Sequence, residues 1–101
     1  MTRRTAILQT SANANTATEA LDMALALASM DQSVQLVLSG DAVKVLQQSP
    51  SKRYAMLELL DAEPIGLVSD NDLNIDLDTQ TIATAKLREL LDSFDEVLQF
   101  S

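Results

Sequence analysis

Oxygen-bearing side chains are concentrated in residues 69–78, which read SDNDLNIDLD. Carboxylate and amide oxygens are the ligands that calcium prefers in proteins. An EF-hand loop that began at Asp70 would place Asp72 and Asn74 at its third and fifth ligand positions, as the motif requires. The first half of this stretch therefore has the spacing of a calcium loop.

The second half of the stretch does not continue the calcium motif. The sixth position would be Ile75, where the loop needs glycine for its turn, and the twelfth would be Thr81, where a bidentate glutamate is required. A strand rather than a helix is also expected before it. We therefore predict no metal site, and interpret the acids as helix caps and a solvated rim, with Leu73, Ile75 and Leu77 facing the core.

Catalytic groups are scarce in this sequence, because it contains no cysteine and no histidine. Thiolate nucleophiles, zinc sites of the Cys/His type and imidazole bases are therefore excluded. Hydroxyl nucleophiles such as Thr10, Ser11 or Ser39 would need another base, and nothing in the sequence ties Lys44 or Lys86 to any of them. We expect a protein that is not itself an enzyme.

Residues 10–16 (TSANANT) stand between an expected strand and an expected helix, which is where a phosphate site would lie. The amino end of a helix binds anions readily. This loop has no glycine, however, whereas phosphate-binding fingerprints use glycine for close backbone approach. A capped surface loop is the better interpretation, and no cofactor is expected.

The negative charge is confined to one part of the sequence. Residues 1–60 carry five acids and five bases, whereas residues 61–101 carry ten acids and only two bases, Lys86 and Arg88. The net charge of -8 therefore lies in the last 41 residues. Phosphates would be repelled there, so direct binding of nucleic acid is not expected. A solvated acidic face is favoured over a docking surface for a basic partner protein.

Short apolar runs predict strands at residues 5–9, 34–38, 65–68 and 96–100, with a weaker strand at residues 79–82. Ser39, Gly40 and Asp41 predict a turn, with Asp41 as the cap of a short helix ending at Leu46.

Helices are expected between these strands. The first begins at a capping box of Thr16 and Glu19 and continues as an alanine-rich apolar stripe. A second starts near Ser49 or Ser51 and ends by Pro64, and a third covers residues 85–94. Met23 and Met30 lie outside the apolar stripes; they are candidates for partner contacts, although methionine more often fills gaps in a core.

Strands that alternate with helices predict parallel pairing through crossover connections. We therefore expect one α/β domain over residues 1–101, a three-layer α/β/α sandwich with a mostly parallel sheet of four to five strands. No apolar run approaches the roughly 18 residues of a membrane span. We expect no association with a membrane, and we expect a cytoplasmic location.

Three phrases resemble the DsrE/DsrF/DsrH superfamily of sulfur-relay proteins, which includes TusB, TusC and TusD. They are TEALDMALALASMDQSVQLVLSGDAVKVL (18–46), YAMLELLDAEPIGLVSDNDL (54–73) and LRELLDSFDEVLQF (87–100). The last resembles the closing strand of the TusC/DsrF branch. The sequence is shorter than the family pattern around QQSPSK and between Leu73 and Thr84. We therefore expect the fourth strand and the helix before it to be abbreviated, and the partner surfaces there to differ.

The resemblance implies a subunit that assembles with TusB/DsrH-like and TusD/DsrE-like partners. Such an assembly relays persulfide sulfur towards 2-thiouridine in tRNA or, in DsrF relatives, serves sulfur oxidation. The sulfur-carrying cysteine belongs to the TusD/DsrE-like partner, just after its third strand. The same motif places Ser69 at that position here. A serine hydroxyl cannot hold a persulfide, so a non-catalytic subunit is implied.

Two alternatives remain open. The chain could be a stand-alone protein of the DsrE fold that forms a homo-oligomer and binds a small ligand at its loops. An independent hydrolase or metal enzyme is the weakest possibility, because histidine and cysteine are absent.

Overall fold

The computed structural model describes residues 3–30, 32–44, 52–60, 62–70 and 79–101, without the side chains of Lys52 and Arg53. Its elements follow in the order β1 (Arg4–Gln9), α1 (Ala14–Ser29), β2 (Ser33–Leu38), α3 (Lys52–Leu59), β3 (Ile65–Val68), β4 (Thr79–Ile82), the 3₁₀ helix η1 (Thr84–Lys86), α4 (Leu87–Asp92) and β5 (Glu96–Phe100). Residues 42–44 are also helical.

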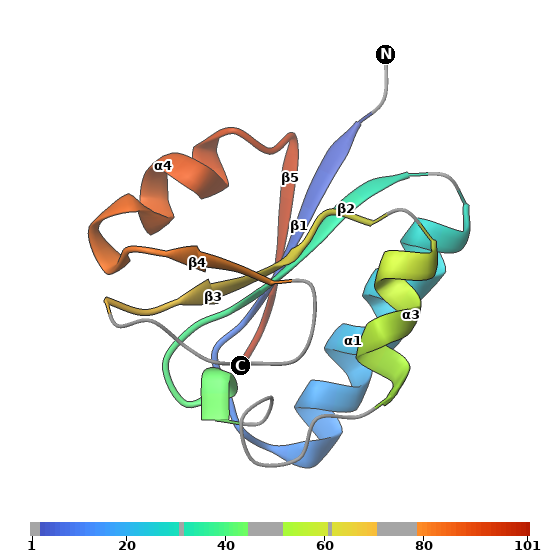
Figure 1. Cartoon of the computed structure of the whole chain (residues 1–101), viewed down its shortest axis with the longest axis horizontal. Coiled ribbons are helices and arrows are strands. Elements are labelled where there is room, and N and C mark those ends of the chain that lie inside the picture. Colours follow the sequence, from blue (N-terminus) through green and yellow to red (C-terminus); the bar gives the residue numbers. More distant parts are fainter. Residues whose placement is uncertain (1–2, 31, 45–51, 61, 71–78) are drawn as a thin grey trace.

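The strands form one sheet of five in the order β4-β3-β2-β1-β5, and every neighbouring pair is parallel. The expected α/β fold with four to five strands is therefore confirmed, including the weaker strand at residues 79–82. The connection from β4 to β5 runs from one edge of the sheet to the other. This crossover carries η1 and α4 across the sheet (Figure 1).

Helices cover both faces of the sheet. Helices α1 and α3 lie side by side on one face, and α4 lies on the other (Figure 1). Successive side chains along a strand point to opposite faces of the sheet, so the core has one part on each face. In β1, Ile7 belongs to the cluster under α1 and α3, whereas Leu8 packs with Leu87, Leu90 and Leu91 on the α4 side. The result is the three-layer sandwich expected from the sequence.

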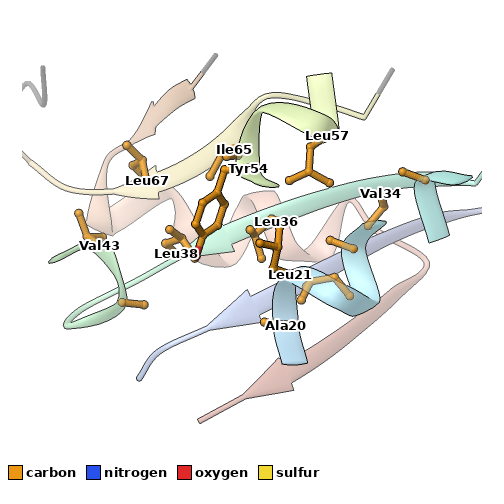
Figure 2. Packing of buried hydrophobic residues seen from close by; sticks show 14 residues of the cluster. Ala20, Leu21, Val34, Leu36, Leu38, Val43, Tyr54, Leu57, Ile65 and Leu67 are labelled. Atoms are coloured by element: carbon orange, nitrogen blue, oxygen red, sulfur yellow. The ribbon is translucent and has the colours of Figure 1, made fainter. Parts of the chain in front are cut away.

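The larger core lies beneath α1 and α3 and is almost entirely aliphatic. Its buried aromatic residue is Tyr54, whose ring lies beside Ile65 and Leu38 over the sheet (Figure 2), and the partly buried Phe100 packs against the same cluster. The side chain of Tyr54 is only 4% exposed. Tyr54 therefore packs on the sheet and is not available as an interface anchor. The alanines of α1 include Ala20 and Ala24, both fully buried, and allow this helix to lie close to the strands.

The start of α1 differs from the expected capping box. The helix begins at Ala14, and its cap is Asn13, whose side-chain oxygen accepts hydrogen bonds from the N–H groups of Asn15 at 2.9 Å and Thr16 at 3.3 Å. Asparagine is among the best N-cap residues, so the helix extends upstream to it. Thr16 and Glu19 consequently lie inside the helix.

The helix expected over residues 85–94 is shorter and composite. It starts as the 3₁₀ turn η1, continues as α4, and ends before Phe94. Phe94 is nevertheless buried, because its ring packs against the guanidinium of Arg4.

The two methionines singled out from the sequence lie at the surface. Met23 is 38% exposed and Met30 is 59% exposed, so the gap-filling role that was favoured for them is wrong. Within the described residues, no helix has both the length and the apolar character needed to cross a membrane.

Candidate functional site

The hydroxyl side chains of Thr10, Ser39 and Ser69 directly follow β1, β2 and β3, at the carboxyl ends of the parallel strands, which we call the carboxyl edge of the sheet. Because all strands are parallel, the residues after β1, β2 and β3 meet at one edge. Each of these turns is tied to the neighbouring strand. Ser39 N–H donates to Gln9 O at 2.9 Å, Ser69 N–H to Ile82 O at 2.9 Å, and Thr10 N–H to Phe100 O at 3.0 Å. Open α/β sheets bind their ligands at this edge.

Ser69 is half-buried and stands directly after β3, as the sequence predicted. Its neighbour Asp70 is exposed and accepts a hydrogen bond on Oδ1 from the N–H of Thr84 at 3.0 Å. Asp70 thus caps the amino end of η1, which confirms for this residue the interpretation of the acids as caps. The assignment of Ser69 to the position of a family cysteine stays a prediction. The remaining acids of the stretch, and Leu73, Ile75 and Leu77, lie outside the described residues.

The amino end of α1 is closed to anions by its own loop. Asn13 occupies the N–H groups of Asn15 and Thr16 with its side chain and that of Ala17 with its carbonyl. Ser11 Oγ in turn accepts the N–H of Asn13 at 3.0 Å. A phosphate would have to displace these bonds, so the capped loop inferred from the sequence is supported.

The lysines considered as possible bases face carboxylates. Lys44 Nζ lies 3.4 Å from Asp41 Oδ1, and Lys86 Nζ lies 3.6 Å from Glu89 Oε2. Both pairs are well exposed. Gly40, with φ of 61°, turns the chain between Ser39 and Asp41.

The part of the chain that the structure describes holds no cluster of three or more acidic side chains suited to a metal ion. Of the residues of the calcium motif, Asp70 belongs to the described part, whereas Asp72 and Asn74 lie outside the described residues.

Two buried glutamines were missed by reasoning from the sequence. Gln9 is fully buried; its Nε2 donates to Ser11 O at 2.9 Å, while its Oε1 has no partner among the described residues. Gln35 is 2% exposed, and its Nε2 donates to Pro64 O at 2.8 Å and to Gln80 Oε1 at 3.2 Å. The sequence feature that could have indicated two buried glutamines is the presence of one glutamine in each of the apolar runs TAILQ and VQLVL.

These features define a class of protein: a five-stranded parallel α/β/α sandwich whose loops at the carboxyl edge carry serine and acidic residues. The model of the DsrE/DsrF-like family matches residues 3–63, which is more than half of the chain. The chain belongs to the DsrE/DsrF-like family. The match ends before Ser69.

A solved structure extends the likeness to the rest of the fold. The crystal structure of the YchN protein from E. coli is similar with a TM-score of 0.70 and 21% sequence identity, over 99% of this chain and 100% of that chain. At this identity the likeness concerns the fold. No curated protein matches the chain.

Proposed function

We propose that this protein is a non-catalytic, TusC/DsrF-like subunit of a cytoplasmic sulfur-relay complex that serves 2-thiouridine formation in tRNA. It acts by assembling with a TusB/DsrH-like and a TusD/DsrE-like partner, and the TusD/DsrE-like chain carries the reactive cysteine. The coarser part of this proposal, a relation to sulfur-relay proteins, follows from family membership.

The observation that carries the non-catalytic role is the combination of a family fold with a sequence that has no cysteine. Sulfur relay proceeds through a thiolate that attacks a persulfide and becomes the next carrier. No side chain of this sequence can do that, and the residue after β3 is Ser69, whose alkoxide is not accessible at neutral pH.

The proposal is tested by co-expression with small α/β chains encoded beside it, one of which should carry a cysteine after its third strand. Size-exclusion chromatography with mass detection should give one mixed peak of defined stoichiometry. The assembled complex should transfer radiolabelled sulfur from a cysteine desulfurase to its cysteine-bearing subunit, and omission of the present chain should reduce complex yield and transfer.

A chain that forms only a homo-oligomer and ignores these partners would contradict the proposal and favour the stand-alone alternative. A mixed complex that supports sulfur oxidation but not tRNA thiolation would keep the structural role and reject the tRNA pathway. A variant that keeps the chain present serves as the control for its omission. Arg3→Ala removes one exposed ion pair, with Glu96, and should leave assembly intact.

A further inference from the structure

Sulfur in this protein is carried by methionine alone, because the sequence has four methionines and no cysteine. Three of the four lie in the described residues, and each is exposed: Met30 by 59%, Met56 by 47% and Met23 by 38%. The fourth, Met1, lies outside the described residues. Methionine is otherwise among the residue types most often fully buried. The described thioethers are therefore placed where a dissolved reagent can reach them.

Both hydrophobic cores are built without sulfur in the part of the chain that the structure describes. The buried residues of the larger cluster are Ile, Leu, Val, Ala and one Tyr (Figure 2), and those of the smaller cluster are Leu, Val and Ile. Oxidation of a buried methionine to its sulfoxide turns an apolar side chain into a polar one and disrupts the packing around it. Among the described residues, this reaction has no target in either core.

The three exposed methionines belong to one layer of the fold, the helices α1 and α3 on the same face of the sheet (Figure 1). Met23 and the C-cap residue Met30 are seven residues apart, which is about two helical turns, so they lie on the same side of α1. Leu27 lies between them and packs against the larger core. Met23 and Met30 are thus at the border between that core and the solvent.

The fold holds these positions through the backbone. The N–H of Met30 donates to Leu27 O at 3.1 Å and so closes the end of α1 without the side chain. Met23 and Met56 lie inside helices, whose hydrogen bonds also join backbone groups. A sulfoxide oxygen on any of the three side chains would be hydrated by the surrounding water. Oxidation should therefore leave the helices in place.

The reaction needs no catalytic group from the protein. The thioether sulfur attacks one oxygen of hydrogen peroxide; a sulfur–oxygen bond forms, the oxygen–oxygen bond breaks and water leaves. The sulfur loses two electrons, which the peroxide gains. In most proteins cysteine thiolates compete for the oxidant. This sequence has no cysteine, so its methionines are its own oxidisable sulfur groups.

We propose that Met30, Met56 and Met23 are sites of reversible oxidation by hydrogen peroxide, and that the folded protein carries their sulfoxides without loss of structure. Oxidation makes the outer surface of the layer of α1 and α3 more polar. Thiol-dependent sulfoxide reductases restore it, with release of the oxygen as water. The inference does not depend on the proposed function, since it requires neither a partner chain nor a sulfur relay.

The test treats the whole chain with hydrogen peroxide at neutral pH, with N-acetylmethionine amide in the same tube as the reference. Peptide mass spectrometry follows each site, and Met30, Met56 and Met23 should each react within about fivefold of the rate of the reference. The fully oxidised chain should keep its circular dichroism, and its midpoint of thermal unfolding should fall by less than about 4 °C. Methionine sulfoxide reductases should then return it to its original mass.

The matched control is Leu36→Met, which places a thioether in the larger core at a position that is 1% exposed. The change nearly preserves volume, so the variant should fold. Its new thioether should react more than about fivefold more slowly than Met30, and its oxidation should unfold the chain.

If Leu36→Met does not fold, the unmodified chain in urea supplies the comparison, and the three sites should react within about fivefold of their rates in the native chain. Slower reaction of the native sites than this would overturn the proposal. So would loss of structure on their oxidation, or sulfoxides that the reductases do not reduce.

Discussion

The guanidinium of Arg4 lies over the ring of Phe94, with its Cζ atom 4.4 Å from the ring centroid. The same side chain donates to Glu63 Oε1 at 3.0 Å and to Ser93 O at 3.3 Å. Its backbone is also held, since Arg4 N–H donates to Asp95 Oδ2 at 2.7 Å and Asp95 N–H donates to Arg4 O at 2.9 Å. One arginine thus joins β1 to the turns before β3 and β5.

Replacing Arg4 should destabilise the fold. We expect Arg4→Ala to lower the free energy of unfolding by about 1–3 kcal/mol, because the cation–π contact and the hydrogen bonds to Glu63 and Ser93 are lost together. The control Arg3→Ala removes an ion pair whose side chains are 62% and 41% exposed, so it should cost about 0.5 kcal/mol or less. Urea unfolding followed by circular dichroism measures both, and equal losses would show that Arg4 has no special role.

Gly66 lies directly against a side chain of the neighbouring strand. A Cβ atom at this position would lie 2.6 Å from Ile82 Cδ1, whereas its next contacts, with Val37 and Gln35, would be 3.4 and 3.5 Å away. We expect Gly66→Ala to cost about 1–3 kcal/mol of stability through overpacking. Ile82→Val removes the clashing atom and alone should cost about 0.5–1.5 kcal/mol.

The double variant Gly66→Ala/Ile82→Val should therefore be more stable than the sum of the two single changes by about 1 kcal/mol. Thermal and urea unfolding of all four proteins completes the cycle. Strict additivity would mean that the strand backbone shifts to accept the methyl group without involving Ile82.

The two buried glutamines should respond differently to the same substitution. Gln35→Met leaves Pro64 O and the amide of Gln80 without their donor, which should cost about 1–3 kcal/mol. Gln9→Met also removes an acceptor that has no partner among the described residues, so the loss of its bond to Ser11 should be largely offset, with a net change within about 1 kcal/mol. A large loss at Gln9 would instead indicate that a buried water satisfies its Oε1.

A thiol introduced at position 69 should not turn the chain into a sulfur carrier. We expect Ser69→Cys to react with iodoacetamide at neutral pH no faster than a short cysteine peptide, because the adjacent carboxylate of Asp70 disfavours a thiolate. Ser39→Cys, a half-buried position after β2 at the same edge, is the matched control. Faster alkylation of Ser69→Cys than of both references, together with uptake of sulfane sulfur, would argue against the non-catalytic role.

The sequence predicted a helix or strand well where the residues of that element alone, with the turn residues beside it, indicated its type and its ends. The strands Ile65–Val68, Thr79–Ile82 and Glu96–Phe100 begin and end as expected, because short β-rich runs are bounded by turn residues. The first helix was placed too late, since the capping-box spacing of Thr16 and Glu19 competes with a stronger single cap at Asn13. A choice between two plausible caps depends on the path of the chain into the helix, which the local sequence does not define.

The features of the site that depend on tertiary contacts could not be predicted. Gln9 and Gln35 resemble surface residues until the strand order places both in the interior of a five-stranded sheet. Arg4 has no sequence neighbour that identifies Phe94 or Glu63 as its partner. Asp70 was interpreted as a cap, yet the N–H that it accepts belongs to Thr84, fourteen residues along the chain.

The pairing of β1 with β5 sets a condition on biosynthesis. Arg4 and Asp95, which hold each other at the start of these strands, are 91 residues apart in the chain. During translation, β1 emerges long before β5, so its pairing on that side is completed only once residues 96–100 have been synthesised. Closure of the sheet therefore depends on contacts of long sequence separation and is a late event in the folding of the domain.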